Sequence, residues 1–552
     1  MAHRIFSVIV LFVFCCVTPV SAQEANRYMV YFTDKNNSPY SISAPNAYLS
    51  QRAIDRRTRQ SITITTADLP VDSAYLDSIN STGAQVVYAS RWFNAAVIGA
   101  DSVQLVQISQ FSFVKTIDMV RGSDYYARLS KNNSTPTPLI SRVASITGYQ
   151  TQLSMIGVDS MHQKGYHGEG MLITMLDAGF INAPNRSFFD SLFLNNQIIA
   201  TYDFVLSQPN VYQSDDHGTE TLSLLAANQP GVMMGTAYKA DYILLVTEDV
   251  TSESPVEEAN WLRGAEYADS AGTDVISCSL GYNTFDNPAF NLTYSDLNGH
   301  TSIASRAASM AAARGILVCN SAGNQGGQES WPYILVPADA DSIIAVGAVD
   351  GSGNYAYFSS IGPTSDGRIK PDLVAQGLNT TVGLSTGTTG TDVGTDDGTS
   401  FSCPLVAGLA AGFWQAFPKL KNVDVIQYLK QSASQYTDPD DLLGYGIPFF
   451  PKAYDLAAGI TYVVPPQPRT LKTLYPNPVS GSLKLTAILA SDTGPVIYEL
   501  TDVSGKIIAN GSAELNANST LEIEVEQLIS GMYFVTITSA SGTYRAKFIK
   551  IG

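Results

Sequence analysis

The sequence predicts a multidomain α/β protein. A central parallel sheet covered by helices is expected between a small N-terminal α+β domain and a small C-terminal β-sandwich. The chain has 552 residues, which is more than one domain usually contains. Continuous apolar runs alternate with helix-like stretches from about residue 146 to 459, the pattern of a parallel sheet with two covered faces. Shorter alternating runs on both sides indicate antiparallel strands.

Residues 1–22 have the features of a secretory signal peptide. Arg4 gives a positive start, Ile5–Val17 is apolar, and Ser21-Ala22 ends a small-residue stretch. A short buried helix is the alternative. The apolar run is shorter than the roughly 20 residues that cross a bilayer. No later stretch is long and apolar enough either, so we expect export without an integral membrane span.

Residues 23–128 are expected to form the α+β domain. The runs YMVYF, SITIT, AQVVYA and NAAVIGA are typical of strands, and residues 46–59 and 72–81 are compatible with helices. Residues 129–147 are rich in Ser, Asn, Thr and Pro, which predicts an exposed linker where proteolysis could separate the domains.

Residues 148–459 are expected to form the parallel-sheet domain. The runs MLITMLD, DYILLVT, DVISCSL, ILVCNSAG and SIIAVGAV predict strands, and stretches such as CPLVAGLAAGFWQAF predict helices. Functional groups in such sheets gather at the carboxyl ends of the strands. A Pro-rich linker at 460–470 then precedes residues 471–552, where short alternating strands separated by Gly, Asn and Ser predict the β-sandwich.

The net charge of −17 argues against a nucleic-acid-binding protein. The acidity is local, since residues 150–458 hold 33 acidic and 12 basic residues. Residues 23–149 have the opposite sign, with 12 basic and 9 acidic residues. We hypothesise that this complementarity steers the docking of the two regions, an effect that salt should weaken.

Four residues have the chemistry and the local sequence of a catalytic site. Asp177 ends a strand, His217 precedes a helix of small residues, Asn324 follows a strand, and Ser400 begins a helix whose N-terminus favours developing negative charge. Each also has an ordinary interpretation: a strand-end cap, a surface histidine, a turn asparagine and an N-cap serine.

Together, the segments LDAGF, DDHGTE, SAGNQGG and DDGTSFSCPLVAG resemble the subtilisin-like serine peptidases, over the stretch from Gly148 to Ala458. The chain order Asp–His–Ser is itself diagnostic, because other folds place the same groups in other orders. The resemblance implies a secreted endopeptidase that acts on protein or peptide substrates. Its implied roles are Ser400 as nucleophile, His217 as base, Asp177 as its orienting carboxylate, and Asn324 with the Ser400 N–H as oxyanion donors.

The same resemblance implies that Ser279, Leu280 and Gly281 pair with the extended substrate as an added strand. Two positions depart from the family pattern: Ala178 stands where Ser or Thr is usual, and Glu220 where histidine is frequent. Neither removes a catalytic group. Leu335 is expected to line the specificity pocket, where a large side chain would narrow it.

No cofactor is expected for the chemistry. Many members of this family bind structural calcium, but no Asp-x-Asp-x-Asp-Gly loop occurs in this sequence. A calcium site is therefore left open and unassigned.

Both flanking regions have resemblances of their own. The N-terminal domain resembles the inhibitory, chaperone-like prodomain of the same peptidases, which implies a partner in cis; an independent binding module is the alternative. The C-terminal region, with YPNP at 475–478, GMY at 531–533 and the terminal Lys547 and Lys550, resembles the sorting domain of type IX secretion substrates. It implies the type IX machinery as a partner and a secreted or cell-surface location; a substrate-binding sandwich is the alternative.

Two further function classes remain as alternatives. A non-catalytic surface or adhesion protein could keep a peptidase fold, although it would be free to lose the four residues. A cysteine peptidase using Cys403 or Cys278 lacks a neighbouring histidine in the sequence. Cys278, Cys319 and Cys403 all lie in apolar segments, and we expect them to be small buried hydrophobic residues rather than disulfide partners.

Overall fold

The computed structural model describes residues 26–122, 148–387 and 390–460. Beyond residue 460 it describes residues 469–470, 473–475, 477–480, 484–488, 494–502, 506–515, 520–539 and 542–551. The predicted signal peptide, the linker at 129–147 and most of the linker at 460–470 lie outside the described residues. The chain divides into two compact units, residues 1–460 and 461–552. No helix among the described residues is long and apolar enough to cross a membrane.

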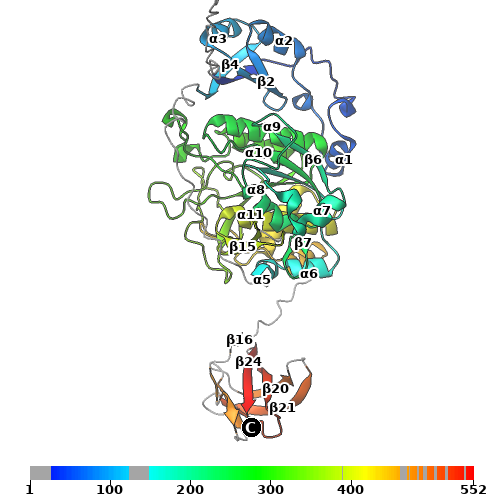
Figure 1. The fold of residues 1–552 in the computed structure, drawn as a ribbon, viewed down its shortest axis with the longest axis vertical. Helices are drawn as coiled ribbons and strands as arrows, with labels where there is room; N and C mark the ends of the chain where they lie inside the picture. Colours follow the sequence, from blue (N-terminus) through cyan, green and yellow to red (C-terminus); the bar gives the residue numbers. More distant parts are fainter. Residues whose placement is uncertain are drawn as a thin grey trace, which may run out of the picture. The chain divides into compact units, whose positions relative to one another are not determined.

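A parallel sheet forms the centre of the first unit (Figure 1). Its strand order is β13-β12-β11-β10-β5-β9-β6, and every neighbouring pair is parallel. The strands are β5 (Leu172–Asp177), β6 (Ile198–Asp203), β9 (Asp241–Val246), β10 (Val275–Cys278), β11 (Leu317–Ser321), β12 (Ile344–Val349) and β13 (Leu373–Gln376).

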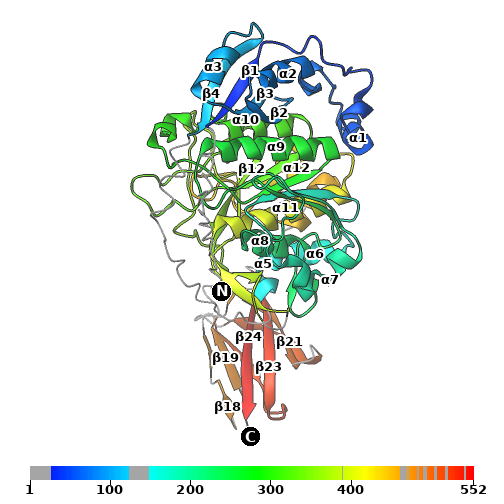
Figure 2. The same ribbon diagram turned by 45° about the horizontal axis from the view of Figure 1, so that its top comes forward.

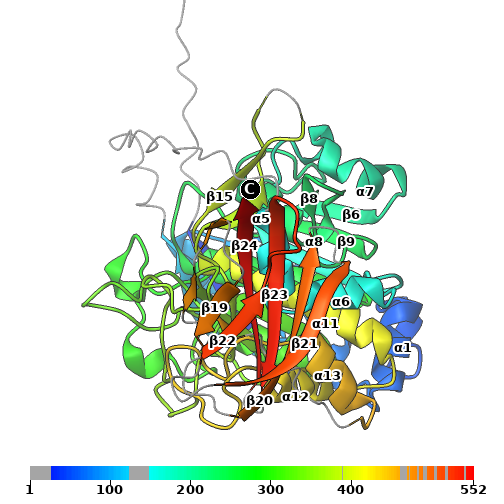
Figure 3. The same cartoon turned by 90° about the horizontal axis from the view of Figure 1, so that it is seen from below.

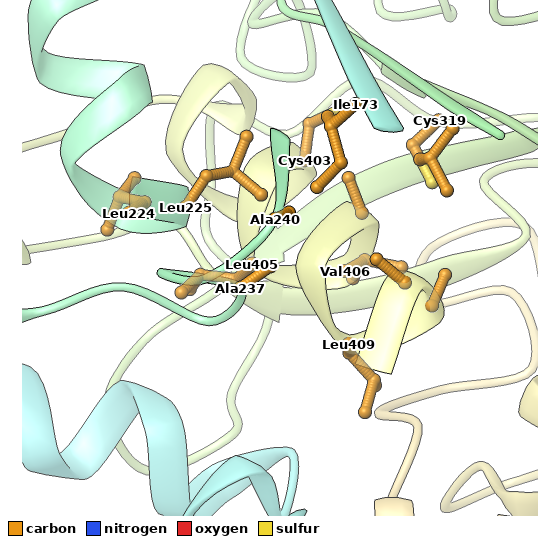
Figure 4. Close-up of a cluster of buried hydrophobic side chains, with 14 of the residues drawn as sticks. Ile173, Leu224, Leu225, Ala237, Ala240, Cys319, Cys403, Leu405, Val406 and Leu409 are labelled. Carbon is orange, nitrogen blue, oxygen red and sulfur yellow. The ribbon is translucent and has the colours of Figure 1, made fainter. Parts of the chain in front are cut away.

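Helices cover both faces of this sheet (Figure 2). Helices α8 (His217–Ala226), α11 (Thr399–Ala416), α12 (Asn422–Ser432) and α13 (Phe450–Ala457) share one apolar core with the sheet, whereas α9 (Pro255–Ala271) and α10 (Ile303–Ala313) share the other. Figure 4 shows part of the first core, with Ile173 of β5 near side chains of α8 and α11. The shorter elements are α5 (Gly148–Met155), α6 (Val158–Gln163), α7 (Asp190–Leu194) and the strand pairs β7–β8 (Asn228–Gln229, Met233–Met234) and β14–β15 (Thr380–Gly383, Val393–Asp396).

The N-terminal region forms an antiparallel sheet of order β2-β3-β1-β4 with three α-helices. Its strands are β1 (Arg27–Phe32), β2 (Gln85–Ser90), β3 (Ala95–Gly99) and β4 (Val114–Arg121), and its helices are α1 (Gln51–Arg59), α2 (Ser73–Ser81) and α3 (Ser102–Ile108). The prediction of a strand at SITIT is wrong. Residues 62–65 are in no strand, because Ile62 packs beside Gly315 of the central domain instead of pairing in the sheet.

The two faces of this N-terminal sheet have different partners. Val30 and Ile98 point into the region's own core beneath α2 and α3, whereas Met29 and Val97, one position along each strand, belong to the core shared with α9 and α10. Successive strand residues face opposite sides of a sheet. Both faces of this sheet are therefore hydrophobic, because one packs against the region's own helices and the other against the central domain. The N-terminal region is therefore docked by an apolar face as well as by charges.

A buried cluster of ion pairs holds the N-terminal region to α9. The carboxylate of Asp269 is fully buried and accepts from Arg56, Arg57 and Arg91, with N–O distances of 2.5, 2.9 and 2.6 Å. Burial alone would raise the pKa of Asp269, but the three guanidinium groups outweigh it and hold the pKa at about 2. The opposite charges noted in the sequence thus meet in direct, desolvated contacts. One acceptor from the central domain binds three donors from the N-terminal region.

Helix α1 also reaches the edge of the parallel sheet where β10 and β11 begin. Arg56 donates to the carbonyls of Thr273 and Arg314, and Gln60 donates to the Gly315 carbonyl at 2.7 Å while accepting from the Asn422 N–H at 2.9 Å. These contacts satisfy backbone groups of turns that precede the strands. The N-terminal region therefore contacts both a face and an edge of the central domain.

The second unit contains two sheets around one core. The larger sheet has the path β16-β24-β23-β20-β21 with β18 beside β24, and the smaller one has the order β17-β19-β22. Figure 3 shows β20, β21, β23 and β24 of the larger sheet. The strands are β16 (Arg469–Thr470), β17 (Thr473–Tyr475), β18 (Val479–Ser480), β19 (Lys484–Ile488), β20 (Gly494–Asp502), β21 (Ile507–Leu515), β22 (Thr520–Glu524), β23 (Gly531–Ser539) and β24 (Gly542–Ile551). Buried residues of β20, β22, β23 and β24 share one cluster, so the predicted fold class is confirmed for all three regions.

The Asp269 cluster predicts a local effect on the opening of the N-terminal region. An Asp269→Asn variant removes the carboxylate that three buried guanidinium groups share, of which Arg57 alone keeps a second carboxylate, Asp68, at 3.0 Å. Removing one partner of a buried ion pair costs about 3–5 kcal/mol. Hydrogen exchange of the α1 amides, measured by mass spectrometry on the full chain, should become at least about a hundredfold faster. Asp438→Asn, at an exposed carboxylate, is the control. Equal α1 protection in both variants would contradict the role given to Asp269.

Candidate active site

The residues singled out in the sequence meet at the carboxyl edge of the parallel sheet. Asp177 ends β5, Ser279 follows β10, Asn324 follows β11, and His217 and Ser400 lie in the first turns of α8 and α11. A cleft of about 370 Å³ is present at this edge. It is lined by Ala178, Asp215, His217, Glu248, Val250, Ser279, Leu280, Gly281, Ser321, Gly323, Asn324, Gln325, Leu335, Thr399 and Ser400.

Asp177 and His217 form a directly hydrogen-bonded pair. The Nδ1 atom of His217 lies 2.7 Å from Asp177 Oδ1. The carboxylate is buried and also accepts from the Ala178 N–H at 2.8 Å and from Thr221 Oγ1 at 3.0 Å. Because the Ala178 and Thr221 donors fix the carboxylate, it in turn fixes the imidazole with Nδ1 inward. The Nε2 atom is then available to accept a proton.

Gly218 allows this approach of α8 to β5. A Cβ atom at Gly218 would lie 2.2 Å from the Gly179 carbonyl oxygen, so a side chain would push the helix away from the strand. The glycine after the histidine, noted in the sequence as permitting close packing, therefore has a steric reason here.

Carboxylates around His217 change its acid–base behaviour. Burial lowers the pKa of the imidazole, but Asp177, followed by Asp215 and Glu220, raises it to about 9. Glu220, the second departure from the family pattern, lies one turn along α8 from the histidine. Its own burial and the nearby Asp396 and Asp216 raise the pKa of Glu220 to about 8. The histidine thus lies in a strongly acidic environment.

Ser400 is the second residue of α11 and is largely buried. Its Oγ donates to the Ser279 carbonyl at 3.3 Å, and Ser279 Oγ donates to the Ser400 carbonyl at 2.9 Å. Among the described residues, no hydrogen bond joins Ser400 Oγ to the His217 ring. Catalytic hydrogen bonds are often long or misaligned until a substrate binds. Both side chains line the same cleft.

Asn324 is held by its carbonyl oxygen, which leaves its amide nitrogen as a donor. The Oδ1 atom accepts from the N–H and the Oγ1 of Thr399, both at 2.9 Å. Thr399 immediately precedes Ser400, so this contact ties the asparagine to the helix start. Sequence reasoning assigned no role to Thr399, although it is part of the DGTS segment.

Residues 279–281 continue from β10 along the wall of the cleft. They belong to no strand, so they offer a sheet edge, although Asn320 Nδ2 already donates to the Leu280 carbonyl at 3.0 Å. The next residue, Tyr282, exchanges two backbone hydrogen bonds with Val336, which fixes the segment. Gly281 lies against Leu335, since a Cβ atom there would be 2.8 Å from Leu335 Cβ.

Two acidic residues of the cleft were missed in the sequence. Asp215 accepts the His217 backbone N–H at 2.8 Å, and Glu248 follows β9 by two residues and accepts from the Tyr282 hydroxyl at 3.1 Å. The signal for Glu248 was its position after a predicted strand, at the same sheet edge as Asp177. Acidic residues are so frequent in residues 150–458 that this position did not distinguish it.

The predicted burial of the three cysteines is confirmed. Cys278, Cys319 and Cys403 are buried and unpaired. Burial raises the pKa of the Cys278 thiol to about 12 and also raises the pKa of the Cys403 thiol. Cys403 Sγ donates to the Cys278 carbonyl at 3.4 Å. Such thiols are poor nucleophiles, since the thiolate is the reactive form.

Comparisons with known proteins match all three regions. A model of the subtilase family matches residues 168–446, one of the peptidase S8 propeptide domain of Bacteroidota matches residues 27–136, and one of a secretion system C-terminal sorting domain matches residues 473–551.

Curated relatives resemble the central region. Subtilisin NAT of Bacillus subtilis subsp. natto is 31% identical over 286 residues, which are 51% of this chain and 65% of the relative. The thermostable alkaline protease of Halalkalibacterium halodurans is 28% identical over 56% of this chain and 75% of the relative. The subtilisin of Bacillus pumilus is 30% identical over 51% of this chain and 90% of the relative.

The acidic surroundings of His217 predict its titration. NMR of the histidine-labelled chain, which has only five histidines, should give a pKa of about 9 for His217. Asp215→Asn removes a charge that favours the imidazolium, so the pKa should fall by about one pH unit. The new amide oxygen can still accept the His217 N–H. Asp438→Asn serves as the control; a His217 pKa that is unchanged in Asp215→Asn would refute this electrostatic account.

Proposed function

This chain belongs to the subtilase family, and we propose that it is a secreted serine endopeptidase made as a self-cleaving precursor. The family match covers residues 168–446, with a propeptide domain before it and a secretion sorting domain after it. The sorting domain indicates a secreted or cell-surface location. The observation that carries the proposed activity is the hydrogen bond between Asp177 and His217, whose side chain lines one cleft with Ser400.

The proposed reaction begins with attack of Ser400 Oγ on a substrate carbonyl. His217 Nε2 takes the hydroxyl proton, and Asp177 stabilises the imidazolium through Nδ1. The oxyanion accepts from the Asn324 amide and the Ser400 backbone N–H at the start of α11. His217 then gives its proton to the leaving amine, which departs and leaves an acyl ester on Ser400. A water molecule, deprotonated by His217, hydrolyses that ester. These steps use only side chains and backbone groups, so we propose no cofactor for the chemistry.

The charge around His217 shapes the proposed pH dependence. A general base must be neutral to accept a proton, and the surrounding carboxylates favour the protonated form up to about pH 9. The fraction of enzyme with a neutral His217 therefore increases as pH rises through neutrality. We expect catalysis to increase with pH in the same range.

Substrate binding is proposed along the segment Ser279–Gly281. Its backbone follows β10 and lies outside every strand, which suits pairing with an extended peptide. The Leu280 carbonyl is already an acceptor for Asn320, and a carbonyl oxygen has room for a second donor. The substrate carbonyl to be attacked would then lie near Ser400, whose Oγ contacts the Ser279 carbonyl.

The N-terminal region is proposed to act as an inhibitor and folding aid in cis until it is released. Its sheet packs on α9 and α10, and its arginines bind Asp269 of α9. The last strand, β4, ends at Arg121, which lies 3.8 Å from Asp249 near the cleft residue Glu248. The described part of the N-terminal region thus ends close to the cleft.

The C-terminal unit is proposed to direct export through the type IX secretion machinery. It is a separate β-sheet unit with its own core, so it can be recognised without altering the peptidase domain. The alternative of a non-catalytic surface protein is tested by the first variant below.

Ser400→Ala should abolish both self-processing and peptidase activity. Loss of the nucleophile should lower casein hydrolysis by at least about a thousandfold, and mass spectrometry should find the precursor uncut. Ser402→Ala is the matched control, because Ser402 lies in the same helix and its hydroxyl donates only to the Thr399 carbonyl. An uncut Ser400→Ala precursor that still hydrolyses casein, or a cut one, would exclude Ser400 as the nucleophile.

Leu335 should restrict the substrate residue whose carbonyl is attacked, the P1 residue. The Leu335 side chain lies between Gly281 and Gly323, where added Cβ atoms would come within 2.8 and 2.7 Å of it. Leu335→Ala opens this space, so kcat/KM for phenylalanine at P1 relative to alanine should rise about tenfold. Val250→Ala, elsewhere in the cleft, should leave the ratio unchanged. A wild-type enzyme that already prefers large aromatic P1 residues would contradict this assignment.

A further inference from the structure

Glu248 is an acidic residue of the cleft to which the proposed mechanism gives no role. It lies two residues beyond β9, is half-buried, and lines the same cleft as His217 and Ser400. The Tyr282 hydroxyl donates to its Oε2 at 3.1 Å and so fixes the carboxylate. Among the described residues that line the cleft, none is Lys or Arg. The carboxylate therefore has no Lys or Arg partner within the cleft, and the nearby His217 is the cleft cation that lowers its pKa.

Two further glutamates lie directly beside Glu248. Carboxylate oxygens of Glu248, Glu253 and Glu257 all fall within 4.8 Å of one another. Glu257 is fully buried and accepts from Ser252 Oγ at 3.2 Å and from the Ser254 N–H at 2.7 Å. Burial raises the pKa of Glu248 to about 7, so the carboxylate is only partly ionised without a cation. A positive group brought into the cleft would favour its ionised form.

The chain itself places a guanidinium group at the rim of this cluster. Arg121, the last residue of β4, lies 3.8 Å from the carboxylate of Asp249, the residue after Glu248. Both side chains are largely buried. Arg121 precedes the linker in which release of the N-terminal region is proposed, so it lies on the amino-terminal side of any bond cut there. A basic side chain on the amino-terminal side of the proposed cleavage site thus already contacts Asp249, the neighbour of Glu248.

We propose that Glu248 and Asp249 form a substrate subsite for a lysine or arginine side chain upstream of the scissile bond. The subsite deepens the proposed peptidase function and rests on it. A long aliphatic stem can pass along Val250 and Leu280 while its charged end reaches Glu248. Glu248 and Asp249 then recognise the lysine or arginine side chain by a charge-assisted hydrogen bond in a partly desolvated part of the cleft.

The test compares peptides that differ by one charge. Quenched fluorescent peptides carry either lysine or norleucine, which has a similar apolar stem without the ammonium group, at each of several positions upstream of one scissile bond. The mature wild-type enzyme should show a kcat/KM for lysine at least about tenfold above that for norleucine at one position. Glu248→Gln keeps an acceptor for Tyr282 but loses the charge, so the ratio should fall close to one. Asp438→Asn should keep the wild-type ratio.

Norleucine peptides report the peptidase function itself and show that each variant is folded. A wild-type enzyme that cuts them without favouring lysine would overturn the subsite and leave the proposed function standing. A lysine preference that survives in Glu248→Gln would overturn it as well. The assay is repeated with calcium and with a chelator. A calcium-dependent rise in thermal stability that Glu248→Gln removes would assign the three glutamates to a metal and overturn the subsite.

Discussion

The parallel direction of all seven central strands is the constraint on which the site depends. Parallel strands place their carboxyl ends at one edge, so Asp177, Ser279 and Asn324 are neighbours although more than a hundred residues separate the first from the last. The same arrangement requires helices to connect the strands, and the N-terminal turns of α8 and α11 supply His217 and Ser400 at that edge. The pair of Asp177 and His217, 2.7 Å apart, follows from this topology and from the small Gly218 that lets α8 approach β5.

Much of this could be predicted from the sequence because the decisive signals are local. Continuous apolar runs between helix-like stretches identify a buried parallel sheet, and Gly-rich segments mark the strand ends where the candidate residues lie. The residues that escaped prediction depend on contacts distant in sequence. Thr399 matters through Asn324, Glu248 through Tyr282, and residues 62–65 left the strand pattern because Ile62 packs beside Gly315.

Acidic residues of the stretch 150–458 gather in two places, on α9 and around the cleft. On α9, Asp269 is neutralised by three arginines of the N-terminal region, which explains the opposite sign of that region. Around the cleft, Asp215, Glu220 and Glu248 have no Lys or Arg partner among the described residues that line it, and Asp215 and Glu220 raise the pKa of His217. Asp269 on α9 thus binds arginines of the same chain. The acidic group around the cleft is suited to a cationic partner that arrives with the substrate. The hypothesised steering would act at long range, where salt screens it, whereas the desolvated Asp269 cluster is screened much less.

The proposed function depends above all on Ser400 being an activated nucleophile. The most direct measurement treats the mature enzyme with a fluorophosphonate, digests it, and locates the adduct by mass spectrometry. Stoichiometric labelling is expected at Ser400, and it should be lost when His217 is replaced by alanine. Labelling of another residue, or no labelling of folded mature protein, would contradict it.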